Sequence, residues 1–235
     1  AVLAVISIIY GSLCAMAQKD LKKLIAYSSV NHMGYVMLGI AAAVAFTEDG
    51  GLLATNRLTA LNGAVFQMVG HGIVTGALFF LVGVIYDRAH TRDIDAFGGL
   101  ARQMPIYAGL MMLACFASLG LPGLAGFVGE FMVFLGAFGS YPVMTGLSLI
   151  GVAITAAFFL IVIQRIFLGE LNVQWQSLRD MDAGELIAIV PLAILMLALG
   201  IFPAPLIAVI NSSMHGLLQT MAHVIQLAGL GFPLS

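Results

Sequence analysis

Long apolar stretches, interrupted only by short polar connections, set the strongest limit on how this chain can fold. Six such stretches lie at roughly 1–17, 24–46, 60–86, 105–138, 142–168 and 185–210, separated where charges, Gly and Pro cluster. Charged residues make up only 9% of the sequence, against ~25% in an ordinary soluble domain. Because a bilayer crossing needs ~20 apolar residues, and barrel strands would be shorter and alternate in polarity, the sequence predicts an all-α integral membrane protein with about six transmembrane helices.

The distribution of positive charges predicts the orientation of these helices. Of the 9 Lys and Arg residues, all except Arg57 fall at one end of the predicted spans. These residues are Lys19, Lys22, Lys23, Arg88, Arg92, Arg102, Arg165 and Arg179. By the positive-inside rule, the connections 18–23, 87–104 and 169–184 then face the cytoplasm, or the matrix or stroma of an organelle. Both chain ends, including a C-terminal tail at 211–235, are expected on the outer side.

The chain begins inside an apolar run, at Ala1, with neither a Met nor a charged region of the signal-peptide kind before it. The first stretch is also short for a full crossing, since Gln18, Lys19 and Asp20 end it early. We therefore expect a truncated first helix, and a chain that is a fragment, a processed piece or one half of a split protein.

The fourth stretch is too long for one plain helix and contains a break in its middle. Pro122 removes a backbone donor, and Gly120 and Gly123 add flexibility on either side of it. The sequence predicts two half-helices joined by an unwound segment. Such breaks occur where neighbouring protein or a wet cavity satisfies the freed backbone, and in transporters they often mark the ion path.

Three titratable residues lie well inside the predicted spans: His32, His71 and Glu130. A charged group at the bilayer centre costs at least ~2.5 kcal/mol on insertion scales, so each is a candidate functional residue. Glu130 follows the Pro122 break, where it could exchange protons; the alternative is that it caps the unpaired donors of the second half-helix.

His32 lies in an unusually polar patch for a membrane helix, residues 27–35, and ~14 Å along the helix axis from Lys23. Imidazole titrates near neutrality and both donates and accepts, which suits a proton relay. A buried core histidine, satisfied by Ser or Asn of a neighbouring helix, is the alternative. His71 lies between two glycines of the third stretch. Lys22 and Lys23 are expected to anchor the second helix and are secondary candidates for feeding protons to His32.

Other kinds of chemistry find no support in the sequence. No Cys/His cluster has metal-ligand spacing, and no phosphate-binding or dinucleotide-binding Gly motif is present. Cys14 and Cys115 lie inside apolar runs, where a disulfide framework has no use. A net charge of −2 gives no reason to expect nucleic acid. We expect no cofactor, metal or redox site in this chain.

Several motifs together resemble a known family. They are the run from Asp20 to Ser29, Asn31-His32-Met33-Gly34, the run from Gln67 to Gly72, His90-Thr91-Arg92-Asp93, and Leu121-Pro122-Gly123 leading into Phe127-Val128-Gly129-Glu130-Phe131. In this order they resemble the antiporter-like proton-pumping subunits of respiratory complex I, over residues 18–131. The carboxylate at Glu130 is similar to one of these subunits, whereas its two sister subunits typically carry Lys at that position.

The resemblance implies a fold of two inverted five-helix repeats with a hydrated polar axis at mid-membrane. Residues 1–168 would be the second five-helix repeat, 169–210 the connection and last transmembrane helix, and 211–235 the tail. The first repeat, with the lysine that closes the central axis, would lie outside this sequence. His32 and His71 then resemble central-axis histidines, and Glu130 the terminal carboxylate of a proton relay.

The resemblance also implies partners and a location. The partners would be the other membrane subunits of complex I, above all the neighbouring antiporter-like subunits, together with lipid, protons and internal water. FMN, iron–sulfur clusters and quinone would bind in partner subunits. The membrane would be the bacterial inner membrane, or the mitochondrial inner or thylakoid membrane. The expected function is proton translocation coupled to NADH:quinone oxidoreduction.

Three alternatives share much of this motif set. The first is a subunit of a multisubunit Na⁺/H⁺ antiporter or of a membrane-bound hydrogenase, against which Glu130 in place of Lys argues modestly. The second is a photosynthetic relative of complex I that is fed by ferredoxin. The third is a scaffold that keeps the fold and has lost conduction, although a scaffold gains nothing obvious from three buried ionisable groups.

Overall fold

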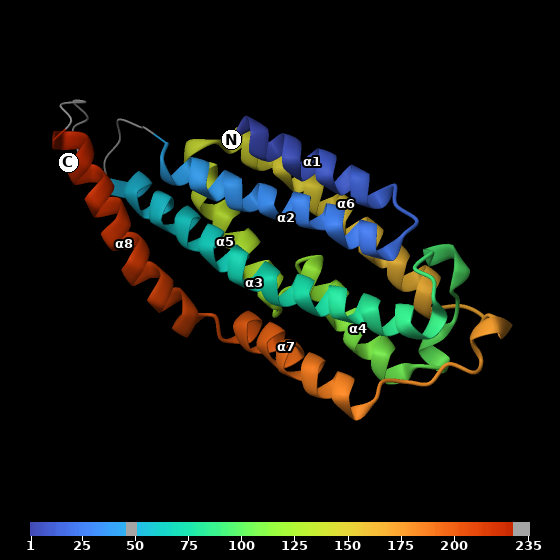
Figure 1. The fold of residues 1–235 in the computed structure, drawn as a ribbon. Coiled ribbons are helices and arrows are strands. Elements are labelled where there is room, and N and C mark those ends of the chain that lie inside the picture. The colour runs from blue at the N-terminus through green and yellow to red at the C-terminus, as the bar shows by residue number, and fades with distance from the viewer. Residues whose placement is uncertain (46–50, 228–235) are drawn as a thin grey trace.

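The computed structural model describes residues 1–45 and 51–227, and within them it is helical with no named strand (Figure 1). The α-helices are α1 (Val2–Met16), α2 (Leu21–Ala43), α3 (Gly51–Ala89), α4 (Pro105–Ser118), α5 (Ala125–Ser140), α6 (Pro142–Phe167), α7 (Ala183–Ile201) and α8 (Ala204–Leu227). Short 3₁₀ turns lie in the connections at Ile94–Ala96, Leu100–Arg102 and Val173–Trp175. The all-α prediction is confirmed for these residues, and the last part of the predicted tail, 228–235, lies outside them.

Apolar length marks several of these helices as membrane-crossing. Within the described residues, Thr55–Ala89 of α3, α6 and α7 are long and apolar enough to span a bilayer, whereas α1, α4 and α5 are apolar but shorter. The central helix is α3, which packs against α2, α5, α7 and α8. In Figure 1, α1, α2 and α6 lie on one side of α3, and α7 and α8 follow it on the opposite side. Together with the sequence, this arrangement defines an integral membrane protein.

Helix boundaries follow from local capping. The carboxylate of Asp20 accepts hydrogen bonds from the backbone N–H groups of Lys22 and Lys23, at 2.9 and 3.2 Å, and so starts α2 three residues before the predicted apolar stretch. Asp182 and Glu185 form a reciprocal capping box that starts α7.

The last predicted stretch, 185–210, is divided in the structure. α7 ends at Ile201 and α8 begins at Ala204. Pro203 and Pro205 explain the division, because proline lacks the backbone N–H that a continuing helix needs. α8 then continues to Leu227 and packs against α3, where the side-chain amide of Asn62 donates to Asn211 at 2.7 Å.

The three connections predicted to share one side of the membrane meet at one end of the bundle. The N–H groups of Leu21 and Ile94 donate to the carbonyls of Arg92 and Lys19, which joins the first connection to the second. The second joins the third through Gly99 N–H donating to Leu168 and Trp175 Nε1 donating to Ala96. Residue 1 lies at the opposite end of the bundle (Figure 1).

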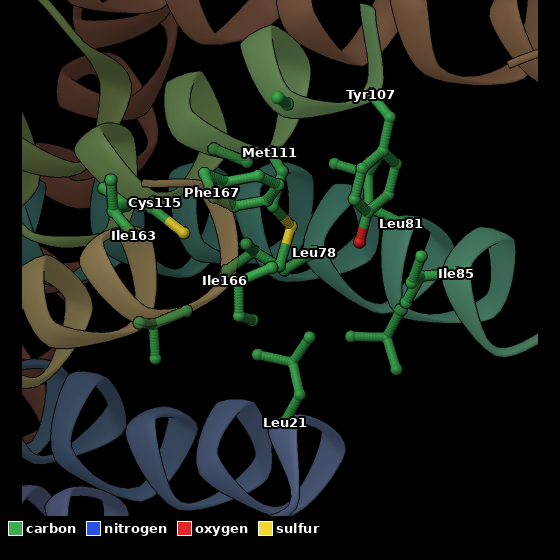
Figure 2. Packing of buried hydrophobic residues seen from close by; sticks show 14 of the residues in the cluster. Leu21, Leu78, Leu81, Ile85, Tyr107, Met111, Cys115, Ile163, Ile166 and Phe167 are labelled. Carbon is green, nitrogen blue, oxygen red and sulfur yellow. The ribbon is translucent and has the colours of Figure 1, made fainter. Parts of the chain in front are cut away.

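Two apolar clusters fill the bundle, one toward each end. The larger cluster lies toward the connections and joins side chains of α2, α3, α4 and α6, including Leu21, Leu78, Met111 and Ile166 (Figure 2). The smaller cluster lies toward residue 1 and is formed mainly by α1, α2, α3 and α5, with Tyr35 among its largest members.

On α1, α2 and α3, buried polar side chains lie between the residues of the two clusters. On α2, for example, Leu24 and Ile25 belong to the larger cluster and Val36 to the smaller one. We call the residues between them the polar layer: Ser12, Ser28, Asn31, His32, Gln67, Ser118, Glu130 and Thr155, all buried. An ionisable pair within this layer therefore has apolar side chains toward both ends of the bundle.

Candidate proton-relay site

His32 and Glu130 meet at the centre of the polar layer. The Nδ1 atom of His32 on α2 lies 3.0 Å from Oε1 of Glu130 on α5, and the two residues are 2% and 6% exposed. This spacing is within direct hydrogen-bond distance, so a proton can pass between imidazole and carboxylate without an intervening group. The structure thus brings together two of the three titratable residues that the sequence placed inside the membrane.

The segment between α4 and α5 lies against the Glu130 carboxylate. Gly120 and Gly123 in this segment have φ angles of +82° and +92°, a left-handed conformation that favours glycine. A Cβ atom on Gly120 would lie 3.1 Å from Oε2 of Glu130, whereas one on Gly123 would meet no atom within 4 Å. Because Gly120 has no side chain, the Glu130 carboxylate can lie close to its backbone.

The second ring nitrogen of His32 also has a partner. Its Nε2 atom lies 3.1 Å from the hydroxyl of Ser118, the last residue of α4. A neutral imidazole has one donor and one acceptor nitrogen. When Nδ1–H donates to Glu130, Nε2 accepts from Ser118, so one ring links the end of α4 to the carboxylate of α5.

His71 lies beside this pair but does not bond to it. Its Nε2 atom is 3.1 Å from the hydroxyl of Ser29, and the Thr75 hydroxyl is 3.2 Å from the ring nitrogens. The centroids of the His71 and His32 rings are 5.2 Å apart. His71 is half-buried, so it is the more accessible of the two histidines.

A small cavity adjoins both histidine rings. It is lined by His32, Gln67, His71, Val74, Ala117, Ser118 and Gly126, and has a volume of about 10 Å³ for the centre of a water molecule. This is close to the space that one water needs. Four of its lining residues, His32, Gln67, His71 and Ser118, carry polar side chains, which is typical of a site in which a buried water bridges donors and acceptors.

The secondary candidates lie elsewhere. Lys22 and Lys23 are exposed at the start of α2, at the connection end, and neither side chain bonds to the polar layer. Nine residues of helix between Lys23 and His32 correspond to ~14 Å. The structure therefore does not bring these lysines into the site.

Sequence reasoning missed four residues that contact the three candidates: Ser29, Gln67, Thr75 and Ser118. Gln67 and His71 are one helical turn apart on α3, so helical periodicity is the signal that could have identified Gln67. Ser29 belongs to the polar patch around His32. No sequence signal distinguishes Ser118 from any other serine near a helix end.

A bundle of apolar helices around a buried His–Glu pair is typical of membrane proteins that cross the bilayer several times. In such proteins, ionisable groups inside the membrane mark ion and proton pathways. A sequence model of the family described as "NADH:quinone oxidoreductase/Mrp antiporter, TM" matches residues 1–155. The chain therefore belongs to the NADH:quinone oxidoreductase/Mrp antiporter transmembrane family.

Individual relatives agree with this family. NADH-quinone oxidoreductase subunit M of Rickettsia bellii is 42% identical over 217 residues, which cover 92% of this chain and 41% of the relative. The chain thus spans less than half the length of this relative. A chain of respiratory complex I from Thermus thermophilus with bound NADH matches 89% of this chain and 43% of its own length, at 32% identity and a TM-score of 0.75.

The fold extends to a second type of complex. A chain of the Mrp complex from Dietzia sp. DQ12-45-1b matches 95% of this chain and 47% of its own length, with a TM-score of 0.81 and 19% identity. At this identity the match shows a shared fold only.

Proposed function

We propose that this chain is the proton-relaying part of an antiporter-like subunit of a respiratory NADH:quinone oxidoreductase. The observation that carries the proposal is the buried contact between His32 and Glu130, 3.0 Å long and enclosed by apolar clusters on both sides. A pair at this depth is a functional feature by default, because ionisable groups inside a membrane are costly to retain. Family membership and the similarity to subunit M support the link to NADH:quinone oxidoreductase.

In the proposed relay a proton moves among His71, His32 and Glu130 in either direction. His32 exchanges a proton with Glu130 at Nδ1, and its Nε2 atom receives or releases a proton on the Ser118 side, where the cavity lies. His71 lies across that cavity, so transfer between the two rings runs through a hydrogen-bonded water. Apolar packing on both sides keeps bulk water from short-circuiting the two surfaces.

The driving force for this relay would come from partner subunits. The sequence has no Cys/His cluster with metal-ligand spacing and no dinucleotide-binding Gly motif, so we infer that FMN, iron–sulfur clusters and quinone would bind in other subunits of the complex. Charge changes in neighbouring membrane subunits would shift the proton affinities of His71, His32 and Glu130 and so couple electron transfer to proton movement.

The same proposal includes an arrangement in the membrane. We infer six crossings, formed by α1, α2, α3, the α4–α5 pair, α6 and α7, with α4 and α5 as the two halves of one helix broken at Gly120-Pro122-Gly123. The interval from Leu119 to Leu124 supports this, since it interrupts two short apolar helices beside the buried Glu130. Residues 1–168 then form the second five-helix repeat, and 169–210 the connection and last crossing.

The positive residues support an orientation. The three linked connections carry nearly all Lys and Arg and would face the bacterial cytoplasm, or the matrix or stroma. Both chain ends, with the tail at 211–235, would then lie on the outer side.

The second candidate function is exchange of Na⁺ for protons in a multisubunit antiporter. The observation that favours it is the fold shared with a chain of an Mrp complex. The relay geometry fits both functions, because each requires a buried group that takes up and releases protons.

Isolation of the native assembly tests the first function against the second. The membrane that contains the full-length protein is extracted in mild detergent, and subunits that co-elute with this chain are identified by mass spectrometry. We expect iron–sulfur and flavin subunits, and NADH-driven quinone reduction by the same fractions. Elution with small antiporter subunits alone, without electron-transfer activity, would overturn the coupling to quinone and assign the chain to cation/proton exchange.

A further inference from the structure

Gln67 occupies a position in the polar layer that the proposed relay does not yet explain. It is 2% exposed and lies on α3, one turn before His71. Its Nε2 atom donates to Oε1 of Glu130 at 3.4 Å, and the same side chain lines the cavity beside both histidines. Gln67 is therefore in contact with both ends of the proposed relay.

The backbone of α5 confines this side chain. α3 and α5 approach closely here, since a Cβ on Gly129 would lie 2.6 Å from Oε1 and 2.8 Å from Cα of Gln67. Gly129 directly precedes Glu130, so the amide is held against the helical turn that carries the carboxylate. A side chain with this little freedom loses little further entropy when it makes its hydrogen bond.

Gln67 and His32 act on the same carboxylate oxygen in different ways. Both contact Oε1 of Glu130, but the histidine's contribution changes with its own protonation, whereas the amide N–H is always a donor. A donor aimed at a carboxylate favours the charged form. When Glu130 is protonated on Oε2, its Oε1 is a carbonyl oxygen that still accepts from the same amide N–H.

We propose that Gln67 is a positioning residue that holds the Glu130 carboxylate against His32 and links it to the cavity beside His71. The proposal rests on the proposed function, in which Glu130 takes up and releases the proton. Without the amide, Oε1 of Glu130 loses a hydrogen-bond donor and keeps its contact with His32.

The titration of Glu130 tests this role directly. Other titratable groups near this face of α5 are His32 and Tyr35 of α2 and His71 of α3. The side chains Arg165 of α6 and Glu185 of α7 are paired with Asp95 and Arg88 at the connection end. Infrared spectroscopy of the full-length protein in its native assembly follows the carboxylic acid band that Glu130→Gln removes, and this band isolates Glu130 from those neighbours.

We expect Gln67→Met, which keeps the length of the side chain, to raise the midpoint pH of the Glu130 band by about one unit. That corresponds to about tenfold tighter proton binding, or about 1.4 kcal/mol. Gln67→Leu also removes the amide donor without adding a titratable group, so it should shift the midpoint in the same direction and serves if Gln67→Met fails to assemble.

Asn62→Leu is the matched control, since it removes another buried amide of α3 that bonds to Asn211 and not to Glu130. An unchanged midpoint in the Gln67 variants, or an equal shift in Asn62→Leu, would overturn the proposal. The titration needs neither NADH nor quinone. A shifted midpoint in a complex that pumps no protons would therefore contradict the proposed function and leave the role of Gln67 intact.

Discussion

Two ion pairs in this protein differ in what they can do. At the connection end, Arg88 of α3 and Glu185 of α7 share two hydrogen bonds of 2.7 Å, with side chains 17% and 19% exposed. In the polar layer, His32 and Glu130 share one contact of 3.0 Å and are more deeply buried. A guanidinium keeps its proton at any physiological pH, whereas imidazole and carboxylate can exchange one.

The difference lies in the partners of each pair. Arg88 also donates to the carbonyls of Arg179 and Asp180, and the carboxylate of Asp180 caps the first N–H groups of α4. This pair and its neighbours therefore connect α3 and α7 to the segment before α7, which in turn contacts α4. The His32–Glu130 pair borders a water-sized cavity and the connection between α4 and α5 instead. The comparison teaches that the pair with more hydrogen bonds to other segments suits a structural role, whereas the pair beside the cavity suits the proton exchange that we propose.

The largest expected effect is the difference in proton translocation between a variant of the His32–Glu130 pair and a variant of the Arg88–Glu185 pair. His32→Leu should abolish proton translocation by the assembled complex, because Glu130 loses its nearest exchange partner. Arg88→Leu should leave the number of protons per electron unchanged and lower the stability of the complex by about 1.5–3 kcal/mol, the usual contribution of hydrogen bonds to charged groups. Proton uptake per electron and thermal unfolding, measured on both variants, check this. A stable Arg88→Leu complex with impaired pumping would break the comparison.

A smaller effect distinguishes buried from connection histidines. His71→Ala should impair proton translocation more than His90→Ala, since His71 adjoins the cavity whereas His90 is exposed and packs edge-on against Tyr86. The rate of proton translocation at equal levels of assembled complex is the measurement. The reverse order would remove His71 from the relay.

The smallest expected effect tests the role of the connection between α4 and α5. Gly120→Ala and Gly123→Ala both place a side chain at positive φ, at a strain of about 1–2 kcal/mol each. Only Gly120→Ala also crowds the Glu130 carboxylate. We expect Gly120→Ala to slow proton translocation by a few-fold and Gly123→Ala to lower stability alone. Equal slowing in both variants would show that backbone strain, and not the contact, matters.

The length of the apolar stretches and the placement of charges predicted the helical class of the fold and the grouping of the connections. Apolar length predicts the helices, and the Lys and Arg distribution predicts that three connections meet at one end, which the hydrogen bonds between them confirm. The division of the last stretch at Pro203 was missed, although proline is a local signal, because the apolar residues continue across it. The early start of α2 depends on the Asp20 cap, which extends a helix beyond its apolar residues.

The candidate site was predictable residue by residue but not as an arrangement. His32, His71 and Glu130 stand out because ionisable residues are rare at membrane depth. Their contacts depend on packing between helices distant in sequence: His32 and Glu130 are 98 positions apart. Gln67 and Ser118 are uncharged, so their presence inside a predicted span did not identify them as functional residues.

Exchange of a proton at Glu130 is the central claim, and Glu130→Gln tests it most directly. The amide keeps the size of the side chain and removes its titration. The measurement is the number of protons translocated per electron by the fully assembled complex, together with its coupled rate of quinone reduction. The account predicts a lower proton yield or slower coupled turnover with the subunit still present. Wild-type proton yield and wild-type turnover in a fully assembled Glu130→Gln complex would contradict it.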